Sequence, residues 1–350
     1  MTIAETRTIT APSVADDIVA QIARQAGASL DEATTLPPAA YVDPGYYELE
    51  VERVFHRDWL VVARLEQVPD AGDSLAVELP GEPVVVVRGE DGDVHVSTVG
   101  GRGVRAELWQ GFVFVNLDER STRPLGMDAL TEVVGNFDFT NYRIVRSLQW
   151  GGGEIDADWK AALENFLEYY HHIGAHRHTL EASRPGLGTV MADGSAGNAV
   201  YHAYCPASAE SAVDEVDGYL IAATTAPVPP ELTPYERSGG GILVRFPLFL
   251  ATRGQSYNFW LQLIPTGPGT HRLTLHALAP LSTIDQLTEE HHDAAMAKFD
   301  EIQAEDAAVN GRVQRLMHSQ YAGGGIFHEQ EFPLLLLQRY LAEMLTVDQA

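Results

Sequence analysis

Five short apolar segments follow one another between positions 199 and 279, separated by turns rich in glycine and proline. We expect strands at 199–205, 219–224, 241–252, 255–265 and 271–279, after an earlier strand at 143–150. Consecutive strands with short connections favour an antiparallel sheet. A long helix is expected at about 284–318 and a further helix at 331–345. The chain is therefore predicted to have an α+β fold.

A second group of short strands precedes this sheet. Runs rich in valine at 59–64, 74–79, 83–88, 94–99 and 111–117 predict a small antiparallel β unit. Asp91-Gly92, between Val87 and Val94, is a strong signal for a hairpin turn. We expect a helix at 46–58 before this unit and a peripheral arm at 1–45. The glycine-rich stretch at 99–104 is expected to be a loop.

The most unusual stretch of the chain is a helix that runs into a cluster of histidines. Asp158 is a suitable N-cap, and apolar residues recur at helical spacing from Trp159 onwards. The helix is followed by a group of polar residues within positions 168–178, namely Glu168, His171, His172, His176 and His178. The whole chain holds only 13 histidines. Four of them in this short stretch indicate a functional site.

The long helix at 284–318 carries one carboxylate on its apolar side. Asp306 lies between Ile302 and Val309 on a stripe with apolar residues at helical spacing, whereas Glu305 falls on the polar face. A buried carboxylate without a partner is costly. The partner of Asp306 is therefore an arginine, a set of backbone donors or a metal ion.

Two histidines and one carboxylate form a site that suits non-haem Fe(II) and oxygen chemistry. Spacing alone does not select the two histidines. His172 and His176 lie four residues apart and share one face of a helix, which slightly favours His172. His171 and His176 converge only if the helix bends or ends, and Gly174 between them makes this plausible.

Composition narrows the classes of partner. The chain has 23 Lys+Arg against 49 Asp+Glu, a net charge of −26, which argues against nucleic acid or an anionic membrane as a partner. No apolar run reaches transmembrane length, and the N-terminus has no signal-peptide pattern, so we expect a cytoplasmic protein. The single cysteine, Cys205, excludes a metal site built from several cysteines of this chain.

The pattern Glu168-x-x-His171-x-x-x-x-His176, preceded by Trp159-Lys160, resembles the mononuclear-iron motif in the large subunits of Rieske non-haem iron oxygenases. The segment from Gln303 to Asp306 also resembles that family. The resemblance implies Fe(II) held by His171, His176 and Asp306, which overturns the slight preference for His172. It also implies that Glu168 acts in catalysis as the bridge for electrons. The implied fold at 142–350 is a helix-grip domain (START/Bet v 1-like), in which an antiparallel sheet wraps around the long helix.

One part of the family's pattern is missing. The family's N-terminal domain holds a [2Fe–2S] cluster with Cys-x-His and Cys-x-x-His. No cysteine precedes Cys205, and the sequence Gly-Gly-Arg-Gly stands at 100–103, where the first pair is expected. The resemblance therefore implies a truncated Rieske-type β domain at 46–141 and no [2Fe–2S] cluster in this chain.

The resemblance also implies an activity. The chain is expected to activate O₂ and to hydroxylate or oxidatively demethylate a small organic substrate. Electrons would come from a separate Rieske protein, ferredoxin or reductase, within a homo- or hetero-trimer or hexamer. One alternative is a non-catalytic partner of a cluster-bearing paralogue, and another is a module that binds a small molecule. The loops at 181–198 and 225–240 are candidate lids, and His291 and His292 are expected to be solvated.

Overall fold

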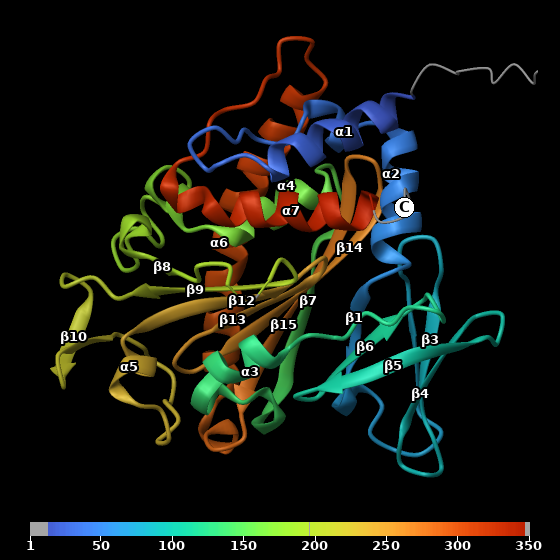
Figure 1. Cartoon of the computed structure of the whole chain (residues 1–350). Helices are drawn as coiled ribbons and strands as arrows, with labels where there is room; N and C mark the ends of the chain where they lie inside the picture. Colours follow the sequence, from blue (N-terminus) through green and yellow to red (C-terminus); the bar gives the residue numbers. More distant parts are fainter. Residues whose placement is uncertain (1–12, 196, 347–350) are drawn as a thin grey trace, which may run out of the picture.

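The computed structural model describes residues 13–195 and 197–346, so the first part of the expected N-terminal arm lies outside the described residues. Two large antiparallel sheets, a separate two-stranded ribbon and a layer of helices make up this part of the chain (Figure 1). The α-helices are α1 (Val14–Ala26), α2 (Pro44–Glu50), α3 (Asp128–Val134), α4 (Trp159–Leu167), α5 (Pro234–Arg237), α6 (Glu289–Met317) and α7 (Phe332–Thr346). None of the helices within these limits is long and apolar enough to span a bilayer.

The larger sheet has seven strands in the order β7-β15-β14-β13-β12-β9-β8, and every neighbouring pair is antiparallel. Its strands are β7 (Tyr142–Ile155), β8 (Val190–Met191), β9 (Val200–Pro206), β12 (Gly239–Arg245), β13 (Phe249–Arg253), β14 (Asn258–Gly267) and β15 (Thr270–Pro280). Helix α6 follows β15 after a short 3-10 turn. The predicted α+β class, with an antiparallel sheet and a long C-terminal helix, is confirmed.

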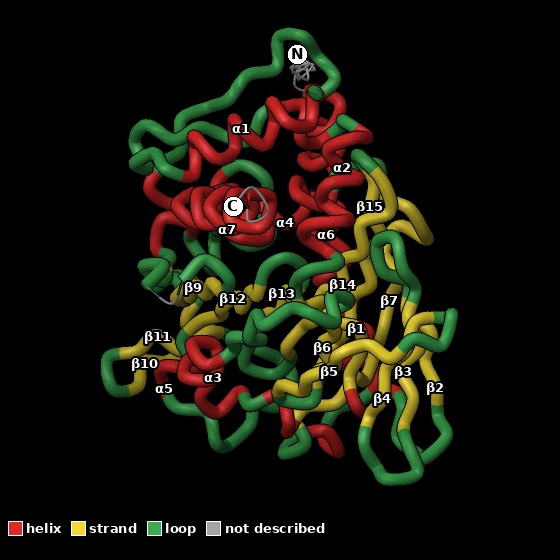
Figure 2. The backbone as a smooth tube through the Cα atoms, turned by 45° about the vertical axis from the view of Figure 1, so that its right-hand side comes forward, coloured by secondary structure: helices red, strands yellow, loops and turns green. Residues whose placement is uncertain are grey.

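The smaller sheet lies beside the larger one and has the order β1-β6-β5-β4-β3-β2 (Figure 2). Its strands are β1 (Trp59–Arg64), β2 (Ser74–Val77), β3 (Val84–Arg88), β4 (Val94–Thr98), β5 (Gly103–Trp109) and β6 (Phe112–Asn116). The Asp91-Gly92 signal is confirmed, because Gly92 adopts φ +84° between β3 and β4. The glycine-rich stretch at 99–104 includes a tight turn, after which β5 pairs with β4.

Two predicted strands differ from the structure. The stretch at 241–252 was expected to be one strand, but it forms parts of β12 and β13, which pair as a hairpin. The strand expected at 219–224 is β11 (Tyr219–Ala222), which pairs only with β10 (Ala212–Val216) in a separate ribbon. Both strands are almost completely buried, so the sequence is mostly apolar and carries no polar signal at the turn between β12 and β13.

The N-terminal helix is not peripheral. Ser13 caps α1 by accepting a hydrogen bond from the Asp16 backbone N–H, and Ile18, Val19 and Ile22 are buried. Helix α1 lies side by side with α7 on one side of the larger sheet (Figures 1 and 2). The expectation of a peripheral arm is therefore wrong for this helix, whose apolar face belongs to the main core.

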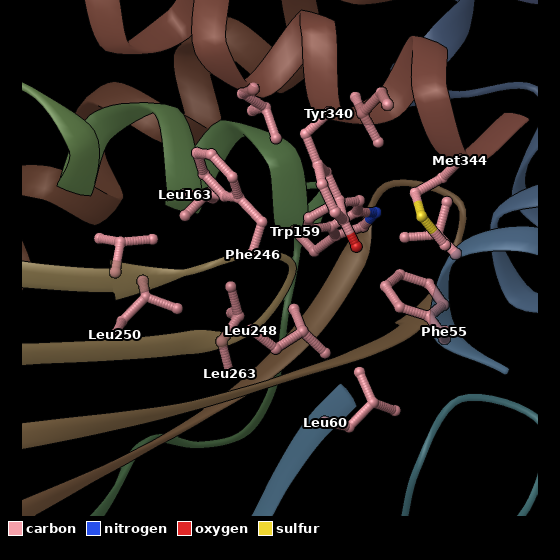
Figure 3. Packing of buried hydrophobic residues seen from close by; sticks show 14 of the residues in the cluster. Phe55, Leu60, Trp159, Leu163, Phe246, Leu248, Leu250, Leu263, Tyr340 and Met344 are labelled. Carbon is pink, nitrogen blue, oxygen red and sulfur yellow. The ribbon is translucent and has the colours of Figure 1, made fainter. Parts of the chain in front are cut away.

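The main core joins the helices to both sheets. Figure 3 shows Trp159 of α4 and Tyr340 of α7 facing residues of the larger sheet, with Phe55 and Leu60 entering from the N-terminal part. All of these side chains are at most 1% exposed. Each large buried side chain stabilises the fold by roughly 1.5–3 kcal/mol. Helix α4, which precedes the histidine cluster, is therefore held firmly from several sides.

Candidate metal centre

The histidine cluster begins where α4 ends. Asp158 caps the helix by accepting the Lys160 backbone N–H at 2.9 Å, as the sequence predicts. Helix α4 stops at Leu167, and Glu168 is extended, with φ −131° and ψ 155°. A 3-10 turn at Tyr170–Ile173 follows. The helix therefore ends before the histidines, which removes the requirement that ligands share one helical face.

Asp306 lies opposite these histidines on α6 and is 7% exposed. Its Oδ1 atom is 2.8 Å from His176 Nε2 and 3.6 Å from His171 Nε2. Its Oδ2 atom accepts a hydrogen bond from Gln303 Nε2 at 3.3 Å. The structure thus brings together all three residues that the family resemblance implies as ligands.

Two further carboxylates take the other nitrogens of these rings. His171 Nδ1 is 2.9 Å from Glu168 Oε1, and His176 Nδ1 is 2.7 Å from Glu305 Oε2. An imidazole that donates its Nδ1 proton to a carboxylate presents a lone pair at Nε2. Both Nε2 lone pairs then face Asp306 Oδ1, a buried atom with no hydrogen-bond donor.

This arrangement fits a cation. Two imidazole nitrogens and one carboxylate oxygen converge with no proton between them when the imidazoles are neutral, which is the donor set of a two-His-one-carboxylate iron site. Without a metal ion, a second proton on His176 can fill the same place. Burial lowers the pKa of His176, but Asp306 and Glu305 outweigh this effect and raise it. Proton and metal ion would therefore compete for the site.

Glu305, which the helical pattern places on the polar face of α6, is partly exposed but also contacts the histidine cluster. Its carboxylate accepts from both His176 Nδ1 and Thr179 Oγ1, the latter at 2.5 Å. Burial raises the pKa of Glu305, but the hydrogen bonds from Thr179 and His176 together outweigh it and lower the pKa overall. The sequence offers no signal for this contact, because His176 is 129 residues away.

His172 lies beside the same centre. It is 4% exposed, and its Nδ1 is 3.0 Å from the Arg184 carbonyl, so Nε2 carries its lone pair. Burial, followed by the nearby His171, lowers the pKa of His172 to about 3. Nitrogen atoms of His171, His172 and His176 all lie within 4.8 Å of one another. His172 thus stays open as an alternative ligand.

A cavity of about 400 Å³ adjoins the centre. The three clustered histidines, Glu168 and Asp306 line one part of it, while Phe166, Ile242, Phe299 and Ile302 form apolar walls. Arg184, from the candidate lid at 181–198, lines the cavity, whereas Gly240, the last residue of the range 225–240, does so as part of strand β12. The cavity lies within the usual range for small-molecule sites, about 300–1,000 Å³.

Other histidines lie away from the centre. The expectation that His292 is solvated is wrong, because its side chain is buried and its Nδ1 is 2.9 Å from the Tyr257 hydroxyl. His291 belongs to the capping box of α6 with Thr288. His178 is exposed. These residues add no ligand to the cluster.

A protein-family model named ring hydroxylating alpha subunit (catalytic domain) matches residues 139–347, more than half of the chain. The chain therefore belongs to this family, and the resemblance drawn from the iron motif is confirmed. Members of the family use mononuclear non-haem iron, which agrees with the donor set described above.

Individual relatives match shorter segments. The biphenyl dioxygenase alpha subunit of Paraburkholderia xenovorans is 46% identical over 61 residues, which cover 17% of this chain and 13% of that subunit. A glycine betaine monooxygenase oxygenase subunit of Pseudomonas aeruginosa is 33% identical over 67 residues, covering 19% and 16%. These matches span less than a fifth of either relative.

Solved structures share the fold. A quaternary ammonium Rieske monooxygenase in complex with L-carnitine superposes with a TM-score of 0.70 at 16% identity, covering 90% of this chain and 97% of that one. Naphthalene 1,2-dioxygenase from Rhodococcus sp., bound to indole, gives a TM-score of 0.68 at 15% identity, covering 95% and 98%. At this identity, the likeness concerns the fold alone.

Proposed function

We propose that this chain is an Fe(II)-dependent oxygenase subunit that hydroxylates or oxidatively demethylates a small organic substrate with O₂. The observation that carries the proposal is the convergence of the buried Asp306 Oδ1 with the Nε2 atoms of His171 and His176 at the edge of the cavity. These three residues would hold the iron, with His172 as the alternative ligand. Bound Fe(II) with open positions would supply the site for O₂ activation.

The remaining residues orient and shield the centre. Glu168 and Glu305 each hold one imidazole by its Nδ1 atom, which fixes the ring orientation and the tautomer. The apolar walls formed by Phe166, Ile242 and Phe299 would exclude water from the reacting part of the substrate. The substrate would bind in the cavity next to the three metal ligands.

Electrons would come from a separate Rieske protein, ferredoxin or reductase. This chain offers only Cys205, which is fully buried in β9 and distant in sequence from the Rieske-type β unit. A surface hollow lined by Tyr170, Ile173 and Val309 also borders His171 and Glu305. A donor docked there, in a trimer or hexamer, would have a short route to the metal through His171.

The test is metal analysis of the full chain purified without oxygen in the presence of Fe(II). We expect about one iron per chain for the wild type and a nearly complete loss in Asp306→Ala, because a required carboxylate ligand is removed. Asp293→Ala is the matched control, since Asp293 is an exposed aspartate of the same helix. A wild-type chain that binds no iron sinks the proposal.

A second candidate is a non-catalytic partner of a cluster-bearing paralogue, favoured by the lack of any cysteine before Cys205. Iron-loaded chain would be mixed with ferredoxin and its reductase, and O₂ consumption would be measured with candidate substrates. Iron at full occupancy without substrate-dependent O₂ consumption would favour the partner. A binding module without redox chemistry would bind organic ligands equally well with and without iron.

A further inference from the structure

Arg184 brings an unpaired positive charge to the cavity of the candidate metal centre. Its guanidinium makes no hydrogen bond or ion pair with any residue that the structure describes, and its Nη1 atom is buried without a partner. Its backbone carbonyl, by contrast, accepts the His172 Nδ1 proton at 3.0 Å. The hydrogen bond between His172 and the Arg184 carbonyl therefore fixes the position of Arg184 beside the histidine cluster.

Two fully buried arginines, Arg64 and Arg245, show what Arg184 lacks. Arg64 pairs with Glu66 at 2.7 Å and donates to the carbonyls of Phe139 and Tyr142. Arg245 pairs with Asp58 at 2.5 Å and donates to nearby carbonyl groups. A chain with 49 acidic residues has supplied carboxylates to these two guanidinium groups, but none to Arg184. A guanidinium nitrogen that is buried without a partner is costly, so a ligand anion is the natural partner of this group.

The strand beneath Arg184 is shaped around it. A Cβ atom placed on Gly240 would lie 2.3 Å from Arg184 Nη1 and 2.9 Å from Cζ. Any other amino acid at this position of β12 would therefore displace the guanidinium. The group lies against the backbone of the sheet, on the wall of the cavity, where its remaining N–H groups can serve a ligand.

The two other cationic residues of the cavity lining, Arg253 and Lys298, are already engaged by other groups. Arg253 also borders the cavity, but its Nη1 donates to the Val133 carbonyl and its guanidinium lies 5.9 Å from the centre of the Phe137 ring, both outside the cavity lining. Lys298 is exposed and pairs with Glu301 at 2.9 Å. Arg184 is thus the charged group of the lining that best suits a ligand anion.

We propose that Arg184 binds a carboxylate of the substrate, so that the substrate class is an apolar organic acid. A planar guanidinium matches a planar carboxylate through two parallel hydrogen bonds. Phe166, Ile242 and Phe299 would contact the apolar body and hold it beside the metal ligands. This inference deepens the proposed oxygenase function and rests on the same cavity.

The test uses three probes of similar shape and different charge. Binding of benzoate, benzamide and benzyltrimethylammonium to the full chain is measured by calorimetry, with and without Fe(II). We expect benzoate to bind about tenfold or more tightly than the other two, because only the carboxylate can form charge-assisted hydrogen bonds with the guanidinium. Equal affinity for benzoate and benzamide would overturn the proposal.

Variants of Arg184 test whether this residue binds the carboxylate of benzoate. Arg184→Gln should abolish the preference for benzoate over benzamide, and Arg184→Lys should retain part of it, since the charge remains but the fork is lost. Lys298→Gln is the matched control and should keep the wild-type preference. Retention of the full preference in a folded Arg184→Gln chain, judged by its circular dichroism and melting temperature, would also overturn the proposal.

The same experiment separates this inference from the proposed function. Asp306→Ala, which should lose iron, is expected to keep the preference for benzoate, because Arg184 rather than the metal would bind the anion. If the preference disappears in Asp306→Ala, the carboxylate binds at the metal and the Arg184 proposal fails. If iron is absent but the preference remains, the oxygenase function fails and the anion site stands.

Discussion

Two groups of buried carboxylates lie near the two ends of α4, and they differ in the charge that faces them. At the start of the helix, Lys160 Nζ lies 2.8 Å from Glu50 Oε1 and 2.7 Å from Asp158 Oδ1. Beyond its end, Asp306 Oδ1 faces the Nε2 atoms of His171 and His176. The first group contains its own permanent cation, whereas the second contains nitrogens that can be neutral.

This difference separates a structural group from a functional one. Lys160 and its carboxylates are at most 1% exposed, and aromatic rings surround the ammonium, including that of Trp159 at 5.1 Å. Burial lowers the pKa of Lys160, but Asp158 and Glu50 outweigh it and raise the pKa, so the charge is kept. Asp306 faces no permanent cation, so its charge is balanced either by a proton on His176 or by an added metal ion.

The largest expected effect concerns Lys160. Lys160→Met removes the cation and leaves the buried Glu50 and Asp158 uncompensated, so we expect a loss of about 3–5 kcal/mol in the free energy of unfolding. Urea denaturation of the metal-free chain measures it. Lys298→Met, at an exposed position, should change the free energy by no more than about 0.5 kcal/mol. Similar losses in both variants would mean that the buried charge has no special role.

Removing the carboxylate of Asp306 from the second group should have only a small effect on the free energy of unfolding. Without metal, Asp306→Ala should lower the free energy of unfolding by no more than about 1 kcal/mol, because the cost of burying the carboxylate offsets most of what its ion pair with a protonated His176 contributes. With excess Fe(II), the wild type should gain stability and the variant should not. Thermal unfolding in both conditions checks this. A large loss in the metal-free variant would identify Asp306 as part of a structural ion pair.

The sequence predicted the parts of both groups that depend on local pattern. Asp158 as the N-cap, α6 and the core-facing position of Asp306 all follow from capping and helical periodicity. Spacing alone favoured His172, because it assumed that the helix continues through the cluster. The extended Glu168 ends α4 earlier, and His171 becomes a neighbour of Asp306 instead.

Long-range contacts could not be predicted in this way. Glu50 and Lys160 are 110 residues apart, and Glu305 and His176 are 129 apart. No local pattern links the members of either pair, since only the packing of α2 and α6 against the segment 158–176 brings them together. For the same reason the partnerless side chain of Arg184 is visible only in the folded chain.

A change at Glu305, in the second group, should have an intermediate effect on Fe(II) affinity. Glu305→Gln should weaken Fe(II) binding by about 10–100-fold, because a partner that orients a metal-binding imidazole is weakened. Competition with a chromogenic chelator under nitrogen measures the dissociation constant. Glu301→Gln, one helical turn earlier and exposed, should leave it unchanged. Equal affinity in the two variants would show that the His176–Glu305 contact does not orient the ring for metal binding.

The smallest effect should appear as a dependence of stability on pH that arises from Glu50 of the first group and from Glu164, whose carboxylate also interacts with Lys160. Burial is the main cause that raises the pKa of both Glu50 and Glu164 from 4.5 to about 7. Between pH 4.5 and 7 the folded chain therefore binds more protons at these groups than the unfolded chain, so their contribution to stability falls as pH rises. The slope for each group is at most about 1.4 kcal/mol per pH unit.

Glu164→Gln isolates one of these contributions. The amide oxygen can still accept the Tyr41 hydroxyl, which now donates to Glu164 at 2.8 Å, but the position no longer titrates. We expect the wild type to lose stability relative to this variant as pH rises from 5 to 8, as measured by urea unfolding at each pH. Because other titrating groups are common to both chains, their effects cancel in the difference. A difference that is constant with pH, or that grows in favour of the wild type, would mean that Glu164 is already ionised in the folded chain and that Lys160 balances it, as it does Asp158.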